Sequence, residues 1–337
     1  MAGKAFFWSA DKGGSGFYRM QLPSWILGKL NVEVKESSYY ISSFTKNATV
    51  VGQRVANPAP SSRWLEMCER PDTVTVYDID DNYFAVDPLS PTAHQFFSQP
   101  SVQKRIVENA KAADYITTCS DALTKVMQDK CPDSRVITIP NGLPLELLSW
   151  EPKQRDQVVI GWVGSAQTWF ELKPIVPFIN KFLRKNPHVA FHTVGVRPDE
   201  LMQSGLDRSL GNQVKVIPPV NPTMNYLQAI NFDVWLAPYR STEFNRCKFP
   251  TKALEAMFLG VPIIASNIDG YRDAVVHGET GFIVKQPDHE WVKYMHQLAK
   301  DTELRSSMRK NAQIRANHYS TESLSSHWLK MIKEGPR

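Results

Sequence analysis

The sequence has few cysteines, and their arrangement excludes two classes of site. There are four in 337 residues, with no C-x-x-C pair and no histidine near them at ligand spacing. Neither a disulfide framework nor a structural zinc site is therefore expected, and a reducing cytoplasm is the simplest setting. The four residues are Cys68, Cys119, Cys131 and Cys247.

Long hydrophobic runs are also missing. No segment approaches the roughly 18 consecutive apolar residues that a membrane-spanning helix needs. The first ten residues, MAGKAFFWSA, hold one lysine and only a very short apolar run, so they predict a first strand rather than an export signal. With 42% hydrophobic and 22% charged residues, the composition is typical of a globular protein of two domains without a transmembrane segment.

The body of the chain lacks an excess of basic residues as well. The net charge is +5, but the segment from Lys300 to Arg337 holds eight Lys and Arg against four Asp and Glu, which leaves only +1 for the rest of the chain. A nucleic-acid channel usually shows a basic stripe along the body. We interpret the terminal charges as solvated helix surfaces, while weak peripheral contact with an anionic membrane, or with DNA, stays open.

The sequence does contain a steady alternation of predicted strands and helices, with no longer internal repeat. Apolar runs of strand length alternate with amphipathic segments in both halves, which is typical of an α/β protein with two Rossmann-like domains. The turn-rich, charged segment from Pro144 to Gln157 separates the halves, and we interpret it as a linker.

The clearest local signals lie between Phe232 and Val284. The run FDVWLAP predicts a buried strand, Pro250 suits the first position of the helix TKALEAMFL, and Gly260 suits its C-terminal cap before the strand VPIIAS. Such a short βαβ unit belongs in a parallel sheet, whose ligands bind at the carboxyl ends of the strands. The loop before Pro250 is therefore expected to lie at a ligand.

That loop and the helix after it carry groups that suit a phosphate. A helix N-terminus exposes unpaired N–H groups, and Arg246, Lys248 and Lys252 add positive charge beside it. Glu255, three residues beyond Lys252, can accept hydrogen bonds from hydroxyls of the same ligand. The alternative is a solvated Lys/Glu pair on a surface helix.

The segments KALEAMFLGVPIIAS and DGYRDAVVHGETGFIV resemble the nucleotide-sugar site of the retaining GT-B glycosyltransferases of family 4, also called glycosyl transferases group 1. In that family a Glu of the EAM-like segment holds the ribose of the nucleotide, and Glu255 is the matching residue. Another family Glu, which contacts the donor sugar, lies eight residues earlier, where this chain has Cys247. Glu243 is the candidate replacement.

The resemblance implies a fold and a division of roles. It implies two Rossmann-like domains with a cleft between them. Residues 1–150, together with a returning helix at 319–337, would bind the acceptor, and residues 151–318 would bind the nucleotide-sugar. The resemblance also implies a nucleotide-diphosphate sugar as donor, no further cofactor and retention of the anomeric configuration. We expect no metal, because the cations lie near the helix after Pro250 whereas the Asp cluster lies in the other half of the chain.

A glycine-rich turn follows the first predicted strand. Gly14, Ser15 and Gly16 open a helix, but Arg19 occupies the third glycine position of a dinucleotide fingerprint, which argues against a nicotinamide-dependent oxidoreductase. By the resemblance, this turn faces the donor phosphates and the acceptor, and Arg19 contacts one of them in a catalytic role. An ordinary turn is the alternative.

A cluster of carboxylates ends the predicted strand TVTVYDIDDNYF. Asp78, Asp80 and Asp81 lie where parallel strands point their side chains toward a ligand. By the resemblance, Asp80 and Asp81 orient an acceptor hydroxyl or act as its general base. The alternatives are caps of the next turn, as Asp commonly provides, or the metal-binding Asp-x-Asp of GT-A glycosyltransferases.

The second half opens with VVIGWVGSA, again a strand and a turn. In family members an Arg commonly follows this glycine and pairs with a downstream Lys to clamp the diphosphate. Here Gly164 is followed by Ser165, with Lys173 further on, and Gly164 and Ser165 are candidate donor-binding residues. We therefore expect Lys248 or Lys252 to supply part of the clamp.

The expected function is transfer of a sugar to a saccharide or to a cell-surface glycan precursor. Two alternatives stay open: a phage-type enzyme that glycosylates a hydroxylated base in DNA, and a non-catalytic nucleotide-sugar-binding protein of the same fold. The near-neutral body favours the saccharide, because a DNA acceptor has to be held by its phosphates.

Overall fold

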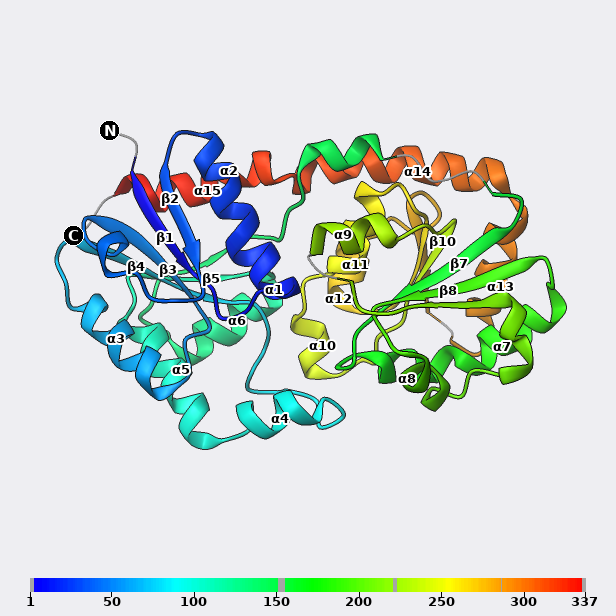
Figure 1. Ribbon diagram of the computed structural model, residues 1–337, viewed down its shortest axis with the longest axis horizontal. Coiled ribbons are helices and arrows are strands. Elements are labelled where there is room, and N and C mark those ends of the chain that lie inside the picture. The colour runs from blue at the N-terminus through cyan, green and yellow to red at the C-terminus, as the bar shows by residue number, and fades with distance from the viewer. Residues whose placement is uncertain (1–2, 151–154, 221–222, 286, 335–337) are drawn as a thin grey trace. The chain divides into compact units, whose positions relative to one another are not determined.

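The chain divides into two compact units (Figure 1). The structure, a computed structural model, describes residues 3–150, 155–220, 223–285 and 287–334. The first unit consists of Met1–Pro144, Arg246–Phe249 and His318–Arg337, and the second of Leu145–Asn245 and Pro250–Asn317. The boundary at Pro144 lies slightly before the predicted boundary at residue 150. Residues 151–154 of the predicted linker lie outside the described residues.

The first unit is built on a six-stranded parallel sheet with the order β2-β1-β3-β4-β5-β6. Strands β3 and β4 are buried along their whole length, which agrees with the segments TVV and TVTV that they contain. The strands are β1 (Lys4–Trp8), β2 (Glu33–Ser37), β3 (Ala48–Gln53), β4 (Thr73–Ile79), β5 (Tyr115–Thr118) and β6 (Val136–Thr138).

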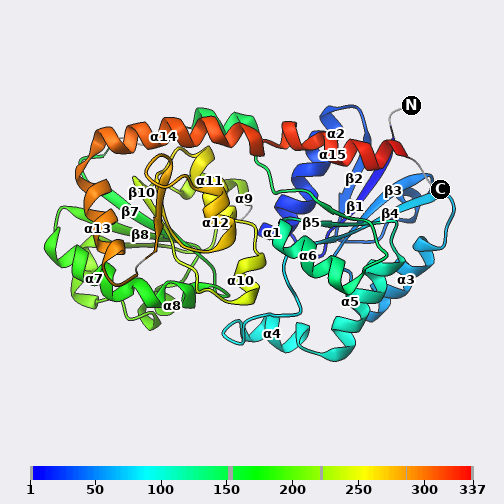
Figure 2. The ribbon, with the colours of Figure 1, turned by 180° about the vertical axis from the view of Figure 1, so that it is seen from behind.

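Helices cover both faces of this sheet (Figures 1 and 2). Helices α2 and α15 pack together on one face, where Trp328 and Met331 of α15 join Phe7 and Val51 in the core. Helices α3 and α5 pack on the other face. The helices are α1 (Gly14–Gly16), α2 (Leu22–Lys29), α3 (Pro58–Cys68), α4 (Pro91–Phe97), α5 (Pro100–Ala112), α6 (Asp121–Lys130) and α15 (Thr321–Glu334), and a π-helical turn (Phe17–Gln21) joins α1 to α2.

The second unit holds another six-stranded parallel sheet, with the order β12-β11-β10-β7-β8-β9. Its main core lies between this sheet and helices α7 and α13, where Phe182 and Trp291 pack on Trp162 and Phe191. The strands are β7 (Val158–Val163), β8 (Val189–Val194), β9 (Val214–Ile217), β10 (Val234–Ala237), β11 (Ile263–Ser266) and β12 (Gly281–Val284).

The helices of the second unit complete the α/β alternation that the sequence predicts. They are α7 (Val176–Lys185), α8 (Pro198–Gln203), α9 (Thr223–Ala229), α10 (Glu243–Cys247), α11 (Thr251–Phe258), α12 (Asp269–Ala274), α13 (Pro287–Lys300) and α14 (Thr302–Ala316). The last two residues of α10, Arg246 and Cys247, already belong to the first unit. Within the described ranges, every helix is too short or too polar to cross a membrane.

Each sheet has one point where the strand order reverses, and this point locates the candidate site of each unit. The reversal lies between β1 and β3 in the first sheet and between β7 and β10 in the second. In open α/β sheets, ligands bind beyond the carboxyl ends of the strands at such a point. The glycine-rich turn follows β1, and the loop that begins at Tyr239 follows β10.

Candidate functional site

In the second unit, the site begins with the loop after β10. The backbone N–H of Tyr239 donates to Ser266 Oγ at the end of the neighbouring strand β11, at 2.9 Å. The ammonium group of Lys252 donates to the Tyr239 hydroxyl at 2.7 Å and lies 4.2 Å from the centre of its ring. Lys252 is therefore fixed at the carboxyl ends of β10 and β11.

Helix α11 carries the two principal candidate residues. It begins at Thr251 with Pro250 as its N-cap, so the first helical residue lies one position later than the prediction for Pro250. Pro250 O accepts from the backbone N–H groups of residues 253 and 254. Gly260 follows the helix with φ +61°, the left-handed conformation that favours glycine after a helix. The boundaries predicted from Pro250 and Gly260 thus agree closely with the structure.

Glu255 is not the solvated surface residue of the alternative interpretation. Only 4% of it is exposed, and its Oε2 accepts a hydrogen bond from the Tyr226 hydroxyl at 2.9 Å. A carboxylate so deeply buried needs hydrogen-bond donors, because leaving a buried charge unpaired is costly. Glu255 is therefore a prearranged acceptor next to the start of α11.

A second buried carboxylate, Glu171, organises the loop after β10, and the sequence gives no signal for it. It is 3% exposed and accepts from the backbone N–H of Arg240 at 2.8 Å, from the Arg240 guanidinium and from Asn245 Nδ2 at 2.8 Å. The Arg240 guanidinium also lies 5.1 Å from the centre of the Phe170 ring. These contacts fold the loop around a single carboxylate.

The backbone N–H groups of the turn after β7 donate hydrogen bonds within the second unit. Gly164 N donates to Val194 O at 3.0 Å, and Ser165 N donates to Thr168 Oγ1 at 2.8 Å. A Cβ at position 164 would lie 2.0 Å from the Trp162 ring, so glycine is required there for packing. The Ser165 side chain remains exposed, and the prediction that it contacts the donor stays a prediction.

In the first unit, the glycine-rich turn is held by a carboxylate that sequence reasoning missed. Asp11 Oδ1 accepts from Gly13 N at 2.6 Å and from Gly16 N at 3.3 Å. The Gly16 N–H thus has a partner inside the protein, and the Ser15 side chain hydrogen-bonds to Asp80. That this turn faces the donor phosphates stays a prediction. A Cβ on Gly16 would lie 2.0 Å from Asp11 O, so the close approach of the two segments requires glycine there.

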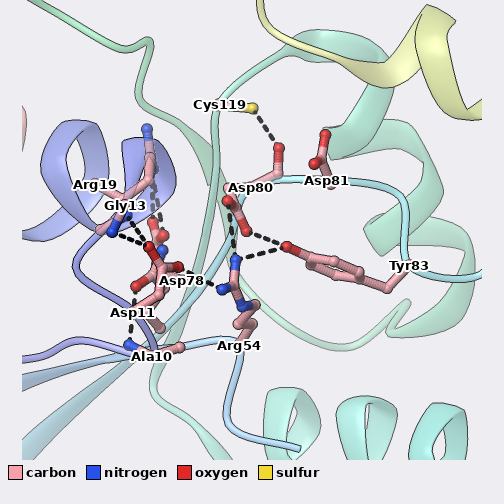
Figure 3. Close-up of polar contacts among 12 residues, drawn as sticks. Ala10, Asp11, Gly13, Arg19, Arg54, Asp78, Asp80, Asp81, Tyr83 and Cys119 are labelled. Atoms are coloured by element: carbon pink, nitrogen blue, oxygen red, sulfur yellow. Dashed lines mark hydrogen bonds and ion pairs between the residues drawn. The ribbon is translucent and has the colours of Figure 1, made fainter. Parts of the chain in front are cut away.

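Arg54 links this turn to the acidic cluster (Figure 3). It follows β3 in a left-handed conformation, φ +36°, which is uncommon for a non-glycine residue. Its guanidinium pairs with Asp11 Oδ2, lies 3.5 Å from Asp80 Oδ2 and donates to the Tyr83 hydroxyl at 2.9 Å. Tyr83 in turn donates to Asp80 Oδ1 at 2.8 Å. One guanidinium therefore positions side chains from the ends of β1 and β4.

The two adjacent carboxylates differ in their pKa values. Burial opposes ionisation of Asp80, but the Arg54 guanidinium and the hydrogen bonds from Ser15 and Tyr83 outweigh it, so the pKa of Asp80 lies below its usual range. Burial raises the pKa of Asp81 against the effect of Lys248, and the charge of Asp80 raises it further. This difference suits an ionised anchor beside a proton acceptor.

The structure corrects the prediction for Arg19. Its side chain is 1% exposed and forms an ion pair with Asp78, which is fully buried, at 2.6 Å. It also donates to Ile139 O and Asn141 Oδ1. Arg19 therefore joins three segments inside the first unit, and its charge is satisfied by interior partners rather than by a ligand.

The segment Arg246–Phe249 belongs to the first unit, whereas the helix that follows it in the sequence belongs to the second. It packs in the first unit, where Lys248 Nζ lies 3.0 Å from Asp81 Oδ1 and Ser120 Oγ donates to Cys247 O at 2.5 Å. Asn82 Nδ2 contacts Cys247 Sγ at 3.6 Å. Lys248 thus serves the acidic cluster rather than the start of α11. Glu243 and Arg246 are exposed on α10, and their roles at the donor stay predictions.

The second unit matches a known family. Residues 150–315 match the family model described as Glycosyl transferases group 1. This range holds the strands, turns and helices that form the site around Lys252 and Glu255.

Two curated relatives are similar in sequence to part of this chain. The capsular polysaccharide biosynthesis glycosyltransferase CapM of Staphylococcus aureus is 27% identical over 188 residues, which cover 53% of this chain and 48% of CapM. A D-inositol 3-phosphate glycosyltransferase of Jonesia denitrificans is 28% identical over 134 residues, which cover 39% of this chain and 30% of that protein. The chain thus spans half or less of the length of these curated relatives.

Solved structures extend the likeness to the whole chain. HepE of Anabaena, solved with UDP and glucose, superposes with a TM-score of 0.69 at 16% identity, covering 98% of this chain and 99% of HepE. Sucrose-phosphate synthase of Thermosynechococcus elongatus superposes with a TM-score of 0.70 at 15% identity, covering 98% of each chain. Residues 150–315 thus form a domain of the glycosyl transferases group 1 family, in a chain that has the GT-B fold.

Proposed function

We propose that the protein transfers a sugar from a nucleotide-diphosphate sugar to an acceptor hydroxyl, with retention of anomeric configuration and without a divalent metal. The observation that carries this proposal is the pairing of Lys252, fixed on Tyr239, with the buried acceptor Glu255 on one helix at the strand-order reversal of the second sheet. A nucleotide diphosphate offers the two matching groups, a phosphate and a ribose.

In this proposal the donor is bound by complementary charges. Glu255 accepts hydrogen bonds from the ribose hydroxyls, while Lys252 and the backbone N–H groups at the start of α11 face the diphosphate. As the sugar leaves, negative charge grows on the diphosphate. A prepositioned ammonium group and helix N-terminus stabilise this charge without reorganising, so a divalent cation is not required.

The acidic cluster of the first unit is proposed to serve the acceptor. Asp80 is already neutralised by Arg54, and Asp81, whose pKa is raised, accepts the proton of the attacking hydroxyl. We propose a saccharide or a cell-surface glycan precursor as acceptor, because CapM is named for capsular polysaccharide biosynthesis. UDP is the first nucleotide to test, because HepE was solved with it.

The test is a panel of nucleotide-sugars, including UDP-glucose, assayed first for binding by thermal shift and then for hydrolysis and for transfer to glycan acceptors. A ligand that binds only the folded state raises the unfolding temperature. Turnover that persists in EDTA supports the proposal. Binding without any hydrolysis or transfer would identify a non-catalytic binding protein, and turnover lost in EDTA and restored by Mn²⁺ would refute metal independence.

A matched pair of variants links the activity to the site. Lys252→Met removes the ammonium group proposed to face the diphosphate, whereas Lys181→Met removes an exposed lysine of α7 that has no role in the proposed site. Transfer should fall at least tenfold in the first variant. Equal rates in Lys252→Met and the wild type would contradict the proposed donor site.

A further inference from the structure

One buried hydroxyl beside Glu255 has no partner inside the protein. Tyr271, on α12, is 0% exposed, and among the residues that the structure describes its hydroxyl makes no hydrogen bond. Most buried hydroxyl groups are paired, since an unpaired one loses its bonds to water without compensation. The unpaired hydroxyl of Tyr271 therefore requires an explanation.

The surroundings of Tyr271 are those of the proposed donor site. Its ring stacks on that of Tyr239, with centres 5.8 Å apart and planes 20° apart. Burial, followed by the neighbouring Tyr239, Glu255 and Glu171, raises the pKa of Tyr271 well above its ordinary value. The hydroxyl therefore stays protonated and can act as a hydrogen-bond donor at any working pH.

Other unpaired polar groups of this unit occupy a different place. The indole N–H groups of Trp162 and Trp235 and the hydroxyl of Thr193 lie on strands β7, β10 and β8, within the sheet. Asn231, whose Oδ1 is also unpaired among the described residues, comes before β10, at the amino end of that strand. Tyr271 lies beyond the end of β11, on the edge where ligands of parallel sheets bind. Its unpaired hydroxyl is thus the one of these five groups that a ligand at this edge can satisfy.

We propose that the Tyr271 hydroxyl donates a hydrogen bond to a ribose hydroxyl of the nucleotide, and that it makes the site selective for ribonucleotides over deoxyribonucleotides. This inference rests on the proposed function. A hydroxyl group is both donor and acceptor. The ribose hydroxyl can therefore donate to Glu255 and accept from Tyr271 at the same time. This contact would supply the acceptor that the Tyr271 hydroxyl lacks among the described residues.

The experiment compares Tyr271→Phe with the wild type by calorimetry, using UDP, 2′-deoxy-UDP and 3′-deoxy-UDP. The variant should bind UDP about three- to tenfold more weakly, the loss expected for one neutral hydrogen bond. It should bind one of the two deoxy analogues as well as the wild type does, because that analogue lacks the hydroxyl in question. Discrimination between UDP and that analogue should shrink by the same factor.

Tyr239→Phe is the matched control, since it removes the neighbouring hydroxyl that holds Lys252. It should weaken the binding of UDP and of both deoxy analogues alike. Tyr271→Phe should leave the unfolding temperature of the ligand-free protein unchanged or slightly raised, because it removes an unpaired buried group. A fall of several degrees would show that the hydroxyl has a structural partner and would overturn the inference.

The remaining outcomes separate the two proposals. If the wild type binds UDP and Tyr271→Phe binds it equally well, the role of Tyr271 is refuted while the proposed function stands. If Tyr271→Phe weakens the binding of UDP and of both deoxy analogues equally, the hydroxyl does not bind the ribose. If the wild type binds no nucleoside diphosphate of a panel with all common bases, the proposed function fails and this inference fails with it.

Discussion

Lys248 and Lys252 lie four residues apart in the sequence and serve different units. The ammonium group of Lys248 lies 3.0 and 3.1 Å from the two carboxylate oxygens of Asp81, in the first unit. The ammonium group of Lys252 lies 2.7 Å from the Tyr239 hydroxyl, in the second. The chain enters the first unit at Arg246 and leaves it after Phe249. Lys248 therefore belongs to the site of the first unit and Lys252 to the site of the second.

We therefore expect Lys252→Met to affect the binding of UDP and Lys248→Met to affect the pH dependence of transfer. Lys252→Met should weaken UDP binding about tenfold or more, because hydrogen bonds to charged groups contribute roughly 1.5–3 kcal/mol each.

Lys248→Met should leave UDP affinity within about twofold of the wild type. It removes the cation that lowers the pKa of Asp81, so transfer should lose its activity at a higher pH as the solution is acidified. Calorimetry and a pH–rate profile measure these effects. If Lys248→Met weakened UDP binding as strongly as Lys252→Met, our separation of the two lysines would be incorrect.

The fold was largely predictable because the buried strands of a parallel sheet are apolar along their length, and such runs are visible in the sequence. The apolar runs that predict the first strand, β4, β10 and β11 are strands in the structure, and helix α11 ends where Gly260 predicts. Helices α10 and α12 were not predicted. They contain five and six residues, too few to show a helical period.

The site was less predictable because its decisive contacts join distant residues. Asn245 and Glu171 are 74 positions apart, and Arg54 and Asp80 are 26 apart. No local pattern distinguishes a buried organising carboxylate such as Glu171 from a surface one. The prediction for Arg19 was incorrect for a related reason, since its partner Asp78 lies 59 positions away. The position of Arg54 after a strand at the order reversal was a usable signal, but only once the strand order was known.

Protonation of His192 should make the protein less stable in mild acid. Burial, followed by the neighbouring cations Lys215 and Arg155, lowers the pKa of His192 to about 4. Between about pH 6.5, the ordinary value, and pH 4, the unfolded chain therefore binds a proton that the folded chain does not, so stability falls as the pH falls through this window. In His192→Gln, urea-unfolding midpoints at pH 7 and pH 4.5 should differ less than in the wild type. An unchanged difference would show that other groups cause the acid sensitivity.

Two glycines of the turn after β1 should respond differently to the same substitution. A Cβ at position 16 would lie 2.0 Å from Asp11 O, whereas a Cβ at position 14 meets nothing within 4 Å. Gly16→Ala should therefore destabilise the protein by about 1–3 kcal/mol, as overpacking typically does. Gly14→Ala is the matched control and should unfold at a urea concentration close to that of the wild type. Similar midpoints for the two variants would mean that the turn can move away from Asp11 at little cost.

The role of Glu255 can be tested separately from that of the diphosphate contacts. Glu255→Gln keeps the shape of the side chain but removes the charge that accepts hydrogen bonds, so UDP should bind about 10- to 100-fold more weakly. Uridine, which has the ribose but no phosphate, should lose affinity by a similar factor, whereas Lys252→Met should weaken UDP and leave uridine unaffected. Tyr226→Phe is the control for a structural effect, since it removes only the donor that holds Glu255 Oε2 at 2.9 Å; it should cost less affinity than Glu255→Gln. If Glu255→Gln binds both ligands as tightly as the wild type and unfolds at the same temperature, the ribose is not held by this carboxylate, and the nucleotide must bind elsewhere on the second unit.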